Sequence, residues 1–298
     1  MRRWCVLAGC VVAGLLAASR PSSADEPFWN SRPLGYWLNQ LQVGTEAERV
    51  QAARGVGEMA ATNGAGSVAA ALPLLVPCLS ASDAPLRAAA ADAIGPMGPR
   101  ADAAIDRLLN LFEHDPVADV RRSAGLAAGS VQPGSPALVS VSTRVLGGDH
   151  DTAVREVAAA MLVESGSAAA AALPVARSGL TDASPIVRVY AAAIVAHAGD
   201  AAAAMPVLLD GLQAVDAAVR VESAGLLGDA GRLDRRTVPA LVAALADEAA
   251  QVRIAAADAL GAIGHSAQAA IDPLWRLIRD PDDGVREHAL GALRRIKE

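Results

Sequence analysis

One stretch of sequence decides the fold of this chain, namely Val252-Arg253-Ile254-Ala255-Ala256-Ala257-Asp258-Ala259-Leu260-Gly261. A close copy stands earlier in the chain, Leu86-Arg87-Ala88-Ala89-Ala90-Ala91-Asp92-Ala93-Ile94-Gly95. The arginine recurs in steps of 38, 34, 34, 33, 32, 33 and 33 residues, at Arg49, Arg87, Arg121, Arg155, Arg188, Arg220, Arg253 and Arg286. A period in this range indicates stacked supersecondary units.

Each repeat is predicted to contain two helices. Counted from the arginine, apolar residues stand at −1, +3, +4 and +7, the spacing of one buried stripe on a helix. Position +3 is always tiny, so neighbouring helices are expected to approach closely there. The first helix is predicted to start at a proline in five repeats, at Pro73, Pro174, Pro206, Pro239 and Pro273. Glycines at +11 are predicted to end the second helix, at Gly98, Gly166, Gly199, Gly231 and Gly264.

These features predict an all-α fold, a right-handed α-solenoid of about eight helical hairpins over residues 34–298. Residues 25–33 contain aromatic side chains and are expected to cap the first repeat, because an end repeat must cover apolar surface. Residues 61–67 are interpreted as a flexible loop and 131–136 as a bend between repeats. The basic turn at 232–236 is expected to be solvated, with a contact to an acidic ligand as the alternative.

The first 24 residues are predicted to be a signal peptide. Arg2 and Arg3 precede an apolar run at 4–18, and Ser22-Ser23-Ala24 has the small residues of a cleavage site. The run is shorter than the ~20 residues of a membrane span. We therefore expect export to the periplasm or outside the cell, cleavage near Ala24, and a mature chain without a span. Lipid anchoring at Cys10 is the less favoured alternative, because the apolar run continues past that cysteine.

Cleavage would leave 23 basic and 32 acidic residues, a net charge of −9. Since no run of Lys and Arg exceeds two residues, this acidic chain is not expected to bind nucleic acid. Cys78 would be the one cysteine of the mature chain, which excludes an intramolecular disulfide and a cysteine metal site. We expect Cys78 to be buried in a helix and Trp275 to belong to the core.

An aspartate stands six residues before the arginine in five repeats, at Asp115, Asp149, Asp182, Asp247 and Asp280. The pattern Asp…Val-Arg-x-x-Ala-x-x-x-Leu-Gly resembles the HEAT repeat family, in particular the bacterial PBS-lyase HEAT-like repeats, over residues 34–298. The resemblance implies a ladder of Asp and Arg side chains between adjacent repeats. Its implied members are Asp115, Arg121, Asp149, Arg155, Asp182, Arg188, Asp247, Arg253, Asp280 and Arg286, with the remaining repeat arginines.

The same pattern indicates where the ladder is interrupted. Val43, Ala81 and Ala214 replace the aspartate in repeats one, two and six. Asp83 and Asp216, four residues before their arginines, are expected to compensate in part. Treated as exposed ion pairs, the ladder steps are each expected to contribute only ~0.2–1 kcal/mol and to set the register of the repeats.

Motifs for catalysis or metal binding are not found in the sequence. The histidines occur singly in five repeats and are not expected to converge, at His114, His150, His197, His265 and His288. The His-Glu pairs that bind iron in deoxyhypusine hydroxylase, a related helical-repeat enzyme, do not occur here. No phosphate-binding loop or nucleophile motif is present either. We therefore expect a protein that is not an enzyme and has no cofactor or metal.

The remaining candidate is the surface of the second helices, which line a concave groove in the family that the chain resembles. Positions +2, +5 and +9 are predicted to point away from the core. Tyr190 and His197 are the expected contact centre, and an ordinary solvated surface is the alternative. The candidate partner-binding residues are Tyr190, His197, Glu222, Asp258 and His288.

The sequence therefore predicts an exported, monomeric, non-catalytic scaffold or adaptor that binds a protein or peptide partner in this groove. A helical-repeat enzyme, or a lyase-like protein that binds a cofactor or chromophore in the same groove, is the alternative. An accessory domain of a larger assembly is a third interpretation.

Overall fold

A computed structural model describes residues 26–230 and 234–297 of the chain as an all-α solenoid of paired helices. The predicted signal peptide, its cleavage site near Ala24 and Cys10 lie outside the described residues. The chain divides into two compact units, with unit 1 ending at Pro133 and unit 2 beginning at Gly134. This boundary falls within 131–136, where the sequence departs from the regular repeat.

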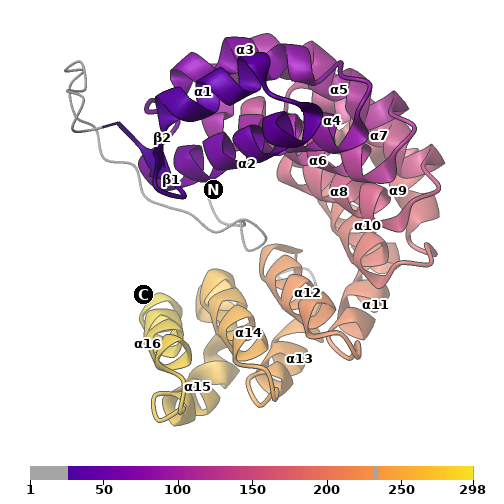
Figure 1. Cartoon of the computed structure of the whole chain (residues 1–298). Coiled ribbons are helices and arrows are strands. Elements are labelled where there is room, and N and C mark those ends of the chain that lie inside the picture. The colour runs from indigo at the N-terminus through magenta and orange to yellow at the C-terminus, as the bar shows by residue number, and fades with distance from the viewer. Residues whose placement is uncertain (1–25, 231–233, 298) are drawn as a thin grey trace. The chain divides into compact units, whose positions relative to one another are not determined.

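Unit 1 consists of a short β-hairpin followed by three helical hairpins in its described part (Figure 1). Its strands β1 (Phe28–Trp29) and β2 (Arg32–Pro33) pair antiparallel. Trp29 packs so closely on α2 that a Cβ atom at Gly55 would lie 2.5 Å from its ring. The helices are α1 (Leu34–Val43), α2 (Glu46–Asn63), α3 (Leu72–Cys78), α4 (Ala84–Ile94), α5 (Ile105–His114) and α6 (Ala118–Val131).

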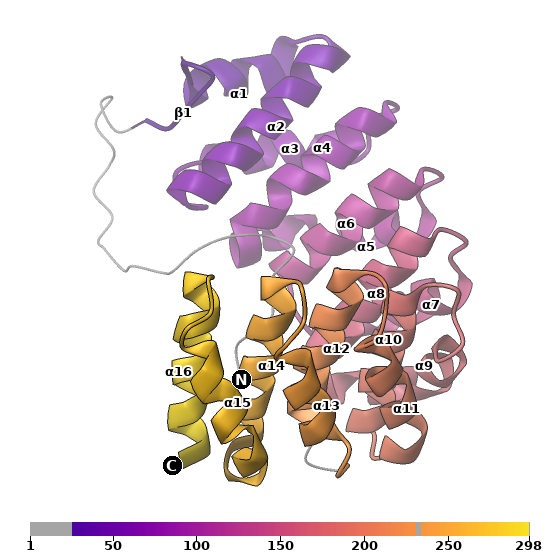
Figure 2. The ribbon, with the colours of Figure 1, turned by 90° about the horizontal axis from the view of Figure 1, so that it is seen from below.

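Unit 2 consists of five helical hairpins in its described part. Its helices are α7 (Pro136–Gly148), α8 (Thr152–Glu164), α9 (Leu173–Gly179), α10 (Pro185–His197), α11 (Ala201–Gly211), α12 (Ala217–Ala230), α13 (Thr237–Ala244), α14 (Ala250–Ile263), α15 (Ile271–Leu277) and α16 (Asp283–Lys297). Within this unit the even-numbered second helices lie side by side in one layer, and the odd-numbered first helices form the other (Figures 1 and 2).

Burial follows the predicted stripe. The tiny residues at +3 are fully inaccessible in all eight repeats, at Ala52, Ala90, Ala124, Ala158, Ala191, Ser223, Ala256 and Ala289. They meet the first helix of their own hairpin, since a Cβ at Gly179 would lie 2.9 Å from that of Ala191 and one at Gly211 would collide with Ser223 Oγ. The small side chain at +3 therefore sets how closely the two helices of a hairpin pack. Cys78 is fully buried, as predicted.

The predicted helix ends are correct in most of the described repeats. Gly166, Gly199 and Gly264 follow the ends of α8, α10 and α14 and adopt positive φ, and Gly231 lies outside the described residues. The prediction for Gly98 is wrong, because α4 ends at Ile94, although Gly98 also adopts positive φ. The prediction for Pro206 is wrong, because α11 begins at Ala201 and contains Pro206 in its interior. Asp200 caps this earlier start by accepting a hydrogen bond from the amide of Ala203 at 3.3 Å.

The prediction that Trp275 belongs to the core is also wrong. Its side chain is 46% exposed, and the ammonium group of Lys297 lies 5.1 Å from the ring centroid. Leu274 and Leu277 are buried instead, because they lie on the side of α15 that faces its partner helix. In the described part of the chain, no helix is both long and apolar enough to span a membrane.

Candidate interaction surface

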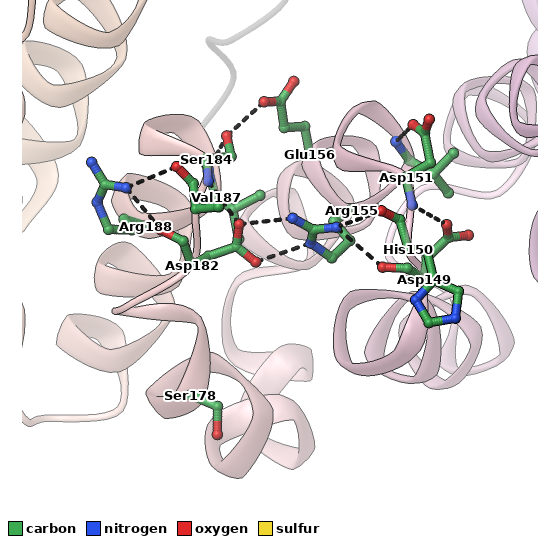
Figure 3. Close-up of polar contacts among 12 residues, drawn as sticks. Asp149, His150, Asp151, Arg155, Glu156, Ser178, Asp182, Ser184, Val187 and Arg188 are labelled. Carbon is green, nitrogen blue, oxygen red and sulfur yellow. Dashed lines mark hydrogen bonds and ion pairs between the residues drawn. The ribbon is translucent and has the colours of Figure 1, made fainter.

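The ladder joins consecutive repeats by bidentate ion pairs. In each step, Nε and Nη2 of an arginine donate to the two carboxylate oxygens of the aspartate in the next repeat at 2.7–3.0 Å. Figure 3 shows this arrangement for Arg155 and Asp182. Steps of this kind within the units are Arg87–Asp115, Arg155–Asp182, Arg220–Asp247 and Arg253–Asp280.

Each ladder arginine also holds the turn of its own repeat. Nη1 of Arg155 donates to the carbonyl oxygens of Asp149 at 3.1 Å and His150 at 3.2 Å. The aspartate is held from its own side as well, since Asp182 accepts a hydrogen bond from the Ser184 amide at 2.8 Å. Nη1 donates to the carbonyl six residues earlier in Arg121 and Arg286 too, and Asp149 accepts from the amide of Asp151.

The ladder pairs are largely buried, which corrects the expectation of exposed ion pairs. The side chains of Arg155 and Asp182 are only 14% and 15% exposed. The hydrogen bond from Arg155 lowers the pKa of Asp182, and that from Arg253 lowers the pKa of Asp280. Removing one partner of a buried pair strands the other charge and costs ~3–5 kcal/mol. The protein is therefore more sensitive to the loss of one ladder partner than to the loss of one partner of an isolated surface pair.

The interruptions of the ladder differ from one another. Ala81 replaces the aspartate that would pair with Arg49, and Nη2 of Arg49 lies 3.3 Å from the buried Sγ of Cys78 instead. Ala214 replaces the aspartate that would pair with Arg188, and among the described residues Arg188 bonds only the carbonyl oxygens of its own turn.

In the described residues, Asp83 and Asp216 do not replace the missing ladder aspartate by an ion pair, and Asp83 acts on Arg87 only through its charge. Their carboxylates accept hydrogen bonds from the Leu86 and Ala218 amides, because four residues before the arginine is the start of the helix, where the nearest donors are backbone amides.

A hollow of about 350 Å³ lies beside the ladder in unit 2. Arg155 and Asp182 line it, and their donors and acceptors are already used by the ladder. His150 and Ser178 are exposed at its rim, and Figure 3 shows them well apart on either side of the ion pair. The hollow therefore brings no nucleophile and base together.

The predicted second-helix surface is only partly exposed. Position +2 is buried in four repeats, at Ala89, Ser123, Val157 and Ala255, which corrects the expectation that it points away from the core. The reason is that adjacent second helices contact each other along this line. Tyr190, Glu222 and His288 occupy the same position and remain partly accessible.

Tyr190 of α10 lies with carboxylates from the second helices on both sides. Its hydroxyl interacts with the carboxylate of Glu222 in α12. Burial, followed by the charge of Glu222, raises the pKa of Tyr190 far above its ordinary value, and Glu164 and Glu156 of α8 add to the effect. Burial also raises the pKa of Glu222, and burial together with Glu222 raises that of Glu164. We call Glu164, Tyr190 and Glu222 the acidic–tyrosine cluster.

His197 does not join Tyr190, although the sequence suggested these two as one contact centre. Nδ1 of the exposed His197 interacts with the Ala193 carbonyl in its own helix at 2.8 Å. The two residues are seven positions apart, which is about 10 Å along a helix. Sequence reasoning missed that Glu164 acts on Tyr190. Glu164 stands at +9 of the preceding repeat, which the pattern predicted to point away from the core, but the pattern does not say which residues of neighbouring repeats lie close together.

Asp258 and His288 form a second polar group, on α14 and α16. His288 Nδ1 lies 2.8 Å from one oxygen of Asp258, and Arg295 Nη2 donates to the other at 2.9 Å. Gly261 makes room for this arginine, because a Cβ there would lie 2.8 Å from Arg295 Nε. The structure thus brings Asp258 and His288 together. In the described residues, no group of three or more His, Cys, Asp or Glu side chains could hold a metal ion.

The turn at 232–236 falls partly outside the described residues. Within its described part, Arg236 Nη2 pairs with Asp234 at 2.7 Å. This arginine is therefore neutralised by its own turn.

Comparison with known proteins places the chain among helical-repeat proteins. A model of HEAT repeats matches residues 36–129 and 205–294, together more than half of the chain. No curated protein sequence matches it.

Two solved structures share its fold over most of both chains. The Escherichia coli protein YibA is 21% identical over 88% of this chain and 92% of its own, with a TM-score of 0.53. The complex of CpcE and CpcF of phycocyanin lyase from a Nostoc species is 19% identical over 94% and 100%, with a TM-score of 0.56. Human deoxyhypusine hydroxylase is 23% identical over 89% and 96%, and its TM-score of 0.38 is too low to support an argument.

Proposed function

The chain belongs to the HEAT repeat family, and we propose that it acts as a non-catalytic scaffold that binds a partner polypeptide through the second helices of unit 2. The acidic–tyrosine cluster is the observation that carries this proposal. It draws one side chain from each of three successive second helices, α8, α10 and α12. Among the described residues, no ladder arginine bonds the carboxylates of Glu164 and Glu222, in contrast to those of Asp182 and Asp280.

The electrostatics of the cluster favour a basic partner segment. Burial raises the pKa values of Glu164 and Glu222, and the charge of Glu222 adds to the effect at Glu164, which indicates carboxylates short of positive charge. A lysine or arginine placed between them would stabilise their charged forms, and the Tyr190 ring would add a cation–π contact. Because Tyr190 keeps its proton at neutral pH, its hydroxyl continues to donate to Glu222 and adds no negative charge of its own.

The two tyrosines of the chain provide a matched test. A photo-crosslinking amino acid is placed at Tyr190 or at Tyr36, which is exposed in unit 1, and cross-linked products are identified by mass spectrometry. We expect a defined partner at position 190 and not at 36. With that partner purified, Tyr190→Ala should weaken binding at least tenfold and Tyr36→Ala should leave it unchanged.

Two results would count against a scaffold at this surface. Cross-linking at position 36 and not at position 190 would show that the partner binds a surface other than the one proposed. A pigment or metal ion that co-purifies and is lost in Tyr190→Ala would favour the alternative, a cofactor-binding protein that uses the same helices.

A further inference from the structure

Arg188 is a ladder arginine whose bidentate donors lack their aspartate. In the four steps described above, Nε and Nη2 donate to a carboxylate. For Arg188, the residue at the position of that aspartate is Ala214. No acceptor within residues 26–230 and 234–297 bonds its Nε or Nη2.

The guanidinium of Arg188 is nevertheless oriented like the others. Its Nη1 donates to the carbonyl oxygens of Asp182 at 2.8 Å and Ala183 at 3.1 Å, as Arg155 does in its own turn. Figure 3 shows both arginines, Arg155 facing Asp182 and Arg188 bonded through one nitrogen. The two remaining N–H groups are therefore pre-organised for a planar, bidentate acceptor.

We call the Nε and Nη2 donors of Arg188 its fork. The charge of Arg188 acts on the nearby Asp182, but no carboxylate of the described residues is hydrogen-bonded to the fork. The side chain of Arg188 is partly exposed, and Val215, next to Ala214, is 101% exposed. Asp216 does not reach Arg188, since its carboxylate accepts from the amide of Ala218. Asp182 is already bound by Arg155.

Other arginines at the irregular ends of the ladder differ from Arg188. Nη2 of Arg49 contacts the Cys78 thiol, and Arg286 pairs with Asp283 in its own helix. The fork of Arg188 thus has the geometry of a filled step without the acceptor.

We propose that Arg188 is a docking point for a carboxylate of a partner polypeptide, an aspartate or glutamate side chain that takes the place of the missing ladder aspartate. Every filled step quoted above shows this arginine geometry binding a carboxylate. The site is separate from the acidic–tyrosine cluster, because residues two apart on a helix point about 200° from each other. It therefore does not depend on the function proposed for Tyr190.

The test uses the full chain and a capped hexapeptide that copies residues 245–250, whose Asp247 fills the step of Arg220. The Nε–H resonances of the arginines are followed by NMR during the titration. We expect the Arg188 signal to shift to saturation while the Arg220 signal, with its fork filled, stays in place. A peptide with asparagine and glutamine in place of its aspartate and its glutamate should bind at least tenfold more weakly.

Two variants separate the fork from charge alone. Arg188→Lys keeps the charge and loses the bidentate geometry, so the peptide's affinity, observed on the peptide resonances, should fall at least tenfold. Arg279→Lys, at an exposed arginine outside the ladder, should leave it unchanged. The proposal is overturned if the peptide without carboxylate side chains binds equally well, if Arg188→Lys has no effect, or if the Arg188 signal does not shift. Saturation by inorganic phosphate at a tenfold lower concentration than the peptide would equally overturn it in favour of a phosphate site.

Discussion

Two acidic regions of unit 2 differ in how their carboxylates are held. In the ladder, Asp182 and Asp280 each face a buried guanidinium, and their pKa values are lowered. In the acidic–tyrosine cluster, Glu164 and Glu222 face each other and Tyr190, and their pKa values are raised. The ladder carboxylates are therefore balanced by guanidinium groups within the framework, whereas the surface that we propose for a partner uses carboxylates whose pKa values are raised mainly by burial.

The strongest test of this comparison is the removal of a ladder carboxylate. Asp182→Ala leaves Arg155 without its partner in a largely buried site and removes the acceptor of the Ser184 amide. We expect the free energy of unfolding, measured by chemical denaturation, to fall by ~3–5 kcal/mol. Asp210→Ala, at an exposed residue of α11, should change it by less than ~0.5 kcal/mol. Equal effects of the two substitutions would mean that the ladder is not structural.

The interrupted step can be repaired to sharpen the same comparison. Ala214→Asp places a carboxylate opposite the fork of Arg188, and we expect stability to rise by about 1 kcal/mol, because the pair is partly exposed. A double-mutant cycle with Arg188→Lys measures the coupling between the two positions. If Ala214→Asp stabilises equally in the Arg188→Lys background, the gain does not come from the bidentate pair.

The two regions should also respond oppositely to pH. The folded pKa of Asp182 lies below its ordinary 3.8, so its contribution is present above that value and is lost as the pH falls through the lowered pKa. The folded pKa of Glu222 lies above its ordinary 4.5, so its contribution is present below that value and is lost as the pH rises through the raised pKa.

Glu222→Gln should therefore stabilise the protein at pH 7 by a few tenths of a kcal/mol, a small effect because solvent screens this partly accessible group. Denaturation curves of the parent and variant from pH 3 to 7 measure it. The gain should vanish near pH 4, where the parent glutamate is also protonated. A gain in stability that does not change with pH would contradict its assignment to the raised pKa of Glu222.

The recurring arginine predicted most of the fold. The +3 and +7 positions and the positive-φ glycines follow from a 3.6-residue periodicity within one hairpin, so they could be read locally. Pro206 and Trp275 were misassigned, since a helix cap at Asp200 and the open side of α15 depend on neighbouring turns and helices. The prediction that position +2 points away from the core is wrong at Ala89 and Val157, which are buried, whereas Tyr190 and Glu222 at the same position are partly accessible.

The sequence by itself determined the repeat, its phase and the family, because burial on a helix follows the spacing of side chains along a few turns. The interruption at Ala214 could also be read from the sequence, because the aspartate is missing there. Only the tertiary structure decided which polar residues of neighbouring second helices meet, since Tyr190 joins Glu222 in place of His197, and Arg295 joins His288 at Asp258. Such pairings depend on how neighbouring second helices pack, which the periodicity within one hairpin does not specify.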